Sequence, residues 1–133
     1  GALIRKFVEA LKTDTSVECW GTGAPMREFM YVDDAAEAIV QALQKYNDAT
    51  QPLNIGTGQD ISIKELVEYI IEATKFTGNV NWNTDKPDGQ MKKLLDTTRM
   101  SEYIDIKPID IKEGIKKTVE WYRGNKEYAD SRK

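Results

Sequence analysis

Apolar side chains recur at helical spacing in the first third of the chain. Residues 2–12 predict a helix whose apolar face is formed by Leu3, Ile4, Phe7, Val8 and Leu11. The next helix is predicted to begin at Asp33 or Asp34, because either carboxylate suits the N-cap position. Its predicted buried stripe consists of Ala36, Ile39, Val40 and Leu43. Both patterns are typical of amphipathic helices that pack on a core.

The clearest start of a helix lies at Ser62. Ser62 and Glu65 have the spacing of a capping box, and Ile61 and Leu66 have that of a hydrophobic staple. The pattern predicts a helix that begins here, with a core face formed by Leu66, Val67, Ile70 and Ile71.

Two further helices are predicted towards the C-terminal end. The first is short and covers residues 98–103, and the second has Asp110 as its N-cap. The inward positions of the second are Ile111, Ile115, Val119 and Tyr122. Residues 124–133 are polar, so we expect a frayed tail after a domain that covers residues 1–123.

Short β-like runs separate the helices. Strands are predicted at residues 17–20, 28–32, 53–55 and 79–83. The polar stretch 84–93 contains the turn sequence Lys86-Pro87-Asp88-Gly89 and is predicted to be a loop. This alternation indicates an α/β fold, or α+β for an isolated piece, with short strands packed against about four helices. The strands are too few and too short for a complete doubly wound sheet.

Composition narrows the classes of function. The chain has 133 residues, 31% of them charged, and a net charge of −3, so it offers no broad positive field for nucleic acid. No apolar run approaches the roughly 20 residues that span a bilayer, and no secretory signal opens the chain. Cys19 is the only cysteine, which favours the cytoplasm and a packing role over a nucleophilic one. With one cysteine and no histidine, a zinc site is not expected.

Two Gly-x-Gly sequences invite a dinucleotide-binding interpretation, at residues 21–23 and 56–58. The fingerprint needs Gly or Ala three positions after the second glycine, where this chain has Met26 and Ile61. We therefore interpret both sequences as turns. Asp33 and Asp34 could be a pair of catalytic carboxylates, but their place at a helix start favours capping.

Trp20, Arg27 and Lys93 each lie near a turn marked by glycine or proline. An aromatic ring and two cations suit a nucleoside diphosphate, because the ring can cover a flat base or sugar face and the cations can neutralise a pyrophosphate. Spacing alone also allows Trp20 in a core and the two cations on solvated faces, so both interpretations stay open at this point.

Several motifs resemble one enzyme superfamily. The run from Trp20 to Asp34, with Met26-Arg27-Glu28-Phe29 and Val32-Asp33-Asp34, is similar to a signature of the extended short-chain dehydrogenase/reductases that act on nucleotide sugars. Asn54-Ile55-Gly56-Thr57-Gly58 fits the same superfamily. The segment Lys86-Pro87-Asp88-Gly89-Gln-Met-Lys92-Lys93-Leu-Leu-Asp96 resembles a loop of the GDP-L-fucose synthase family. The resemblance covers residues 2–122.

The resemblance implies a set of substrate-binding residues. Trp20, Arg27 and Lys93 match that family's Trp, Arg and Lys, and Asp88 matches a further contact to the GDP-sugar. Lys6 aligns with a family arginine, so it keeps the charge and loses the bidentate fork.

The resemblance also implies a reaction: epimerisation beside a keto group, then hydride delivery from NADPH. The family's cofactor loop and its Ser/Tyr/Lys and Cys/His sets match no position here, so no catalytic, cofactor-binding or metal residue is assigned. We expect the chain to be the C-terminal substrate-binding part of such an enzyme and inactive alone, with NADP bound by an N-terminal domain.

Two other functions remain open. One is a stand-alone binding or interaction module without turnover, and the other is a different nucleotide-sugar epimerase or dehydratase. The expected partners are a weakly bound GDP-sugar and a second copy in a homodimer, with no nucleic acid and no membrane.

Overall fold

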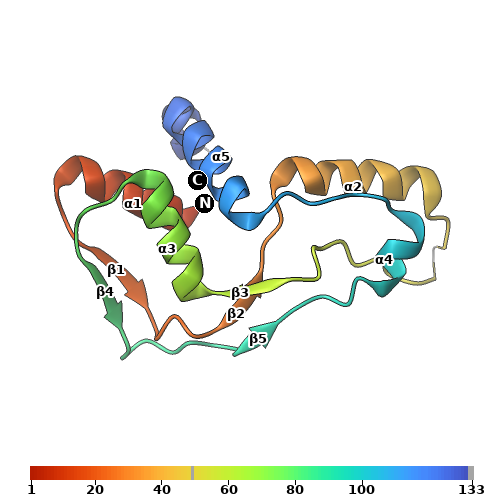
Figure 1. Cartoon of the computed structure of the whole chain (residues 1–133), viewed down its shortest axis with the longest axis horizontal. Helices are drawn as coiled ribbons and strands as arrows, with labels where there is room; N and C mark the ends of the chain where they lie inside the picture. Colours follow the sequence, from red (N-terminus) through yellow and green to blue (C-terminus); the bar gives the residue numbers. More distant parts are fainter. Residues whose placement is uncertain (49, 132–133) are drawn as a thin grey trace.

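The computed structural model describes residues 1–48 and 50–131, and it is elongated (Figure 1). The helices of the described residues are α1 Ala2–Thr13, α2 Val32–Lys45, α3 Ile63–Thr74, α4 Thr98–Tyr103, α5 Ile111–Gly124 and α6 Lys126–Ser131. The strands are β1 Val17–Trp20, β2 Met26–Glu28, β3 Asp60–Ser62, β4 Val80–Asn83 and β5 Lys92–Lys93. This mixture of helices and short strands confirms the predicted fold class.

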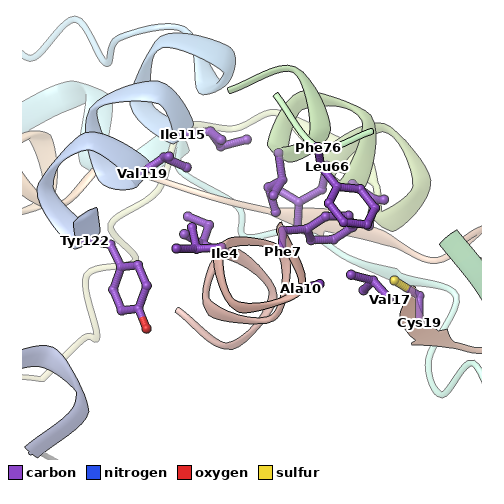
Figure 2. Packing of buried hydrophobic residues seen from close by; sticks show 13 residues of the cluster. Ile4, Phe7, Ala10, Val17, Cys19, Leu66, Phe76, Ile115, Val119 and Tyr122 are labelled. Atoms are coloured by element: carbon purple, nitrogen blue, oxygen red, sulfur yellow. The ribbon is translucent and has the colours of Figure 1, made fainter. Parts of the chain in front are cut away.

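Helices α1, α3 and α5 pack together with β1 and β4 at one end of the molecule, which we call the first lobe (Figure 1). Strands β1 and β4 pair in parallel, with Val17 opposite Val80. Phe7 of α1 is fully buried and meets Phe76 edge to face, with 5.1 Å between the ring centroids (Figure 2). The predicted helix at residues 2–12 is confirmed, and its apolar face forms much of this core.

The predicted N-terminal starts of α3 and α5 are confirmed. The Ser62 hydroxyl accepts a hydrogen bond from the Glu65 amide, and the Glu65 carboxylate accepts one from the Ser62 amide. Asp110 accepts a hydrogen bond from the Lys112 amide at the start of α5. These bonds satisfy amide groups that a helix start otherwise leaves without partners.

Helix α6 ties the last described residues to α1. Lys126 Nζ lies 3.5 Å from Glu9 Oε1, and Arg5 Nε lies 3.7 Å from Asp130 Oδ1. The Tyr122 hydroxyl also meets Asp130 Oδ1 at 3.1 Å. The prediction of a frayed tail is therefore wrong for residues 126–131, while residues 132 and 133 lie outside the described residues.

A small sheet in the order β3-β2-β5 connects the two ends of the molecule (Figure 1). Strand β2 runs antiparallel to β3 and parallel to β5, with Arg27 opposite both Ile61 and Lys93. The extended run predicted at 28–32 is displaced, because β2 covers Met26–Glu28 and α2 already begins at Val32.

Helices α2 and α4 form the second lobe around a smaller core of Ala38, Met100 and Ile104. The N-cap of α2 is Tyr31, with no side-chain cap, so the predicted capping by Asp33 or Asp34 is wrong. Both acids lie in the first turn, where their negative charge interacts favourably with the positive end of the helix dipole. Asp34 Oδ2 also accepts a hydrogen bond from the Ile109 amide at 3.0 Å.

The predicted buried stripe of α2 is also wrong in this chain. Ile39 is 51% exposed, Val40 52% and Leu43 80%. Residues 53–55 form no strand either, because no neighbouring segment pairs with them in the described structure. The apolar pattern of α2 is present, but the described residues do not cover it.

Candidate functional site

Trp20 ends β1 and presents its ring to solvent, with 63% of the residue exposed. Its indole Nε1 donates to Glu18 Oε1 at 3.0 Å, which fixes the edge of the ring. The Lys6 and Lys86 ammonium groups lie 5.9 and 5.4 Å from the ring centroid. Both distances suit cation–π attraction, so positive charge gathers at an exposed aromatic ring.

The turn that follows Trp20 is attached to the predicted loop through Asp88. The Thr22 amide donates to Asp88 Oδ1 at 2.6 Å, and the Thr22 hydroxyl donates to Asp88 Oδ2 at 2.7 Å. These bonds lower the pKa of Asp88 below its ordinary value, the hydroxyl bond having the larger effect. Gly21 has a φ of 77°, and a Cβ on it would collide with the Asp88 carboxylate.

Arg27 and Lys93 form a pair of neighbouring cations on the small sheet. They lie opposite each other on β2 and β5, so their side chains leave the same face. Arg27 is half-buried and donates from Nη1 to the Met26 carbonyl at 2.7 Å, while Lys93 is exposed. The arrangement can offer two positive groups to one anionic ligand.

The Glu28 carboxylate holds the sheet next to these cations. Its Oε1 accepts a hydrogen bond from the Gly58 amide at 2.7 Å, and its Oε2 accepts one from the Leu95 amide at 3.1 Å. One side chain therefore joins β2 to the 56–58 turn and to the segment after β5. No pattern in the sequence predicts this role of Glu28, whose only mark there is its position next to Arg27.

The glycines of both Gly-x-Gly turns pack against other parts of the chain. The Gly58 amide, which a pyrophosphate would need, is already bound to Glu28, and a Cβ on Gly56 would collide with the same carboxylate. Gly23 faces the Trp82 ring, 2.6 Å from the position of a Cβ. The internal contacts of Gly23, Gly56 and Gly58 suit the interpretation of both sequences as turns.

Other candidate chemistry is limited among the described residues. No group of three or more Cys, Asp or Glu side chains there could hold a metal ion. Cys19 is buried in the core of the first lobe, and burial raises the pKa of its thiol, which favours the packing role.

No described helix has the length and apolar character that crossing a membrane requires.

The predicted site residues thus fall into two groups. Trp20, Lys6 and Asp88 surround the turn after β1, and Arg27 and Lys93 share a face of the small sheet. Lys86 joins the first group, although the sequence marks it only as part of a loop motif. A cavity of about 640 Å³ between α3 and α5 is lined by other residues, among them Tyr69, Lys112 and Arg123.

Comparisons with known proteins agree on one family. The model of the NAD dependent epimerase/dehydratase family matches residues 1–56. A probable GDP-L-fucose synthase 1 from Oryza sativa is 39% identical over 93% of this chain and 38% of its own length. GDP-L-fucose synthase from Escherichia coli is 36% identical over 95% of this chain and 42% of its own length. The chain thus spans about two fifths of the length of the curated relatives it matches.

Solved structures show the same likeness. A GDP-L-fucose synthetase from Naegleria fowleri bound to NADP has a TM-score of 0.89 and 29% identity, over 94% of this chain and 40% of that one. A UDP-glucose 4-epimerase with UDP-glucose from Thermotoga maritima has a TM-score of 0.78 and 28% identity, over 92% of this chain and 40% of that one.

Proposed function

Because the chain belongs to the NAD-dependent epimerase/dehydratase family, we propose that it forms the GDP-sugar-binding side of an enzyme similar to GDP-L-fucose synthase. The observation that carries the proposal is the exposed Trp20 ring with two ammonium groups beside it. The strand that follows this ring in the sequence carries Arg27, which pairs with Lys93. The choice of a GDP-sugar as the ligand rests on the names of the relatives.

Each part of the proposed ligand has a suitable partner on this chain. The Trp20 ring offers a flat surface for the guanine base or the sugar, and stacking there buries apolar area. Arg27 and Lys93 offer charge-assisted hydrogen bonds to the diphosphate, with Lys6 as a further cation. Asp88 keeps the turn beside Trp20 in place. In this assignment the residues bind and orient the ligand and transfer no proton.

In the intact enzyme we propose conversion of GDP-4-keto-6-deoxy-mannose to GDP-L-fucose with NADPH. NADP supplies the hydride chemistry when it is bound, and we assign its site to another part of that enzyme, since neither Gly-x-Gly sequence here completes the dinucleotide fingerprint. The residues of this chain would hold the nucleotide end of the sugar substrate.

We expect the 133-residue chain to bind GDP with a Kd of roughly 0.1–1 mM, about 4–5.5 kcal/mol, because only one side of a cleft contributes contacts. Arg27→Ala should weaken binding by about tenfold, the size of one charge-assisted contact. Isothermal titration calorimetry or an NMR titration measures both values.

Lys107→Ala is the matched control, because it removes an exposed cation that belongs to neither group of site residues. An Arg27→Ala chain that binds GDP as well as the unchanged protein would contradict the assignment of the diphosphate. A parallel titration with UDP tests the alternative of another nucleotide-sugar enzyme, which the likeness to the UDP-glucose 4-epimerase favours.

We expect the purified chain alone to oxidise no NADPH when it is given a GDP-4-keto-6-deoxy sugar. The reason is that none of its residues is assigned to hydride or proton transfer. The NADPH absorbance is followed over hours with a full-length GDP-L-fucose synthase as the positive control. Turnover above the rate without protein would reject this expectation. Binding of GDP without turnover would also suit the stand-alone binding module, the alternative from a different class.

A further inference from the structure

The segment that carries Lys86 is anchored at two points, one by a backbone hydrogen bond and one by a side chain. Its amide donates to the Asn83 carbonyl at 3.2 Å, which closes the turn after β4. Two positions later, the Asp88 carboxylate accepts both hydrogen bonds from Thr22. Pro87 lies between the anchors, and its ring restricts the backbone of both Pro87 and Lys86. The exposed Lys86 side chain therefore starts from a backbone with little freedom.

Each oxygen of the Asp88 carboxylate already accepts one short hydrogen bond from Thr22, so the side chain is engaged within the protein. An acid is also a poor direct partner for a diphosphate, which carries the same sign of charge. Its visible effect is to fix the 86–89 segment against the turn that carries Trp20. This distinguishes Asp88 from the cations Lys6 and Lys86, which reach the exposed ring.

We propose that Asp88 is a positioning residue, and that the Thr22–Asp88 contact holds Lys86 over Trp20 as an additional phosphate-binding cation of the site. The inference rests on the proposed function, since it assigns both residues to the same GDP site. It differs from the resemblance, which makes Asp88 a direct contact and gives Lys86 no role.

A double-mutant cycle on GDP affinity separates the two roles of Asp88. Lys86→Gln is expected to weaken GDP binding by about tenfold, as the loss of one charge-assisted contact does. Asp88→Asn alone should weaken it by about three- to tenfold, and by nothing further when Lys86 is already glutamine. Lys107→Gln removes the same charge elsewhere and should leave the affinity unchanged.

A second measurement needs no ligand. The indole N–H signal of Trp20, identified with Trp20→Phe, should shift in Lys86→Gln, because a cation leaves the ring. Asp88→Asn should move the signal in the same direction, and Thr22→Val should move it less, since the Thr22 amide bond remains.

Additive losses of GDP affinity in the cycle would overturn the positioning role, because they would mean that Asp88 contacts GDP itself. An unmoved Trp20 signal in Asp88→Asn would overturn it independently. If the unchanged protein binds no GDP, the proposed function and the phosphate-binding role of Lys86 both fall, and the Trp20 signal still decides whether Asp88 positions Lys86.

Discussion

The Asp88 carboxylate accepts two short hydrogen bonds from Thr22, and both favour its ionised form. Its folded-state pKa is therefore below the unfolded value of about 3.9. The resulting stabilisation is present above the unfolded pKa and is lost as the pH falls through the folded pKa. The attachment of the 86–89 segment should thus persist at mildly acidic pH.

We expect NMR titration of the Asp88 carboxyl carbon to give a midpoint below about 3.9. Thr22→Val should raise the midpoint, because it removes the hydroxyl bond, which has the larger effect on the pKa. Thr22→Ser keeps a hydroxyl and should leave the pKa low. A midpoint at or above the ordinary value in the unchanged protein would mean that the two bonds do not persist in solution.

The contacts of single residues in the site were only partly predictable. The resemblance singled out Trp20 and Asp88, and the structure places both at the same turn. It could not show that Lys86 reaches Trp20, because this contact joins residues from two different strand ends and leaves no periodic signal in the sequence. The Glu28 bonds to Gly58 and Leu95 were missed for the same reason.

The helices show what local patterns can and cannot predict. The Ser62–Glu65 box gave the start of α3, because its bonds are made within one turn. Residues 53–55 have the composition of a strand, yet a strand also needs a partner, and none lies beside them in the described structure. Periodicity likewise showed that α2 has an apolar face, and it could not show what covers that face.

The contrast between α1 and α2 gives a test of stability. Phe7→Ala should lower the free energy of unfolding by about 3–5 kcal/mol, because Phe7 is fully buried against Phe76. At protein concentrations low enough to keep the chain monomeric, Leu43→Ala should change it by less than about 0.5 kcal/mol, since Leu43 is mostly exposed. Chemical denaturation measures both values. A large loss in Leu43→Ala would show that the apolar face of α2 is covered in solution.

At the scale of the whole molecule, α2 leaves Val32, Ile39, Val40 and Leu43 exposed on one element. An apolar surface of this kind favours contact with another surface like it. We therefore propose that the 133-residue chain self-associates through α2 and forms a homodimer at tens of micromolar protein.

Sedimentation equilibrium tests this proposal. The double variant Ile39→Glu with Leu43→Glu should shift the protein towards monomer, because it places two like charges on the contact. Trp121→Glu, which changes an exposed apolar residue of the first lobe, should leave the association unchanged. An unchanged protein that is monomeric throughout would reject the homodimer.

The contacts of α6 with α1 have a consequence for how the first lobe folds. Glu9 and Lys126 are separated by 117 positions, so their contact closes almost the entire described chain into a loop. Contacts of such long range slow folding, because the entropy of the intervening segments is lost before the contact stabilises anything. Within the described chain α1 is synthesised before α5 and α6, so it can contact β1 and α3 before those two helices are available. The contact between α1 and α6 is therefore among the last of these to form.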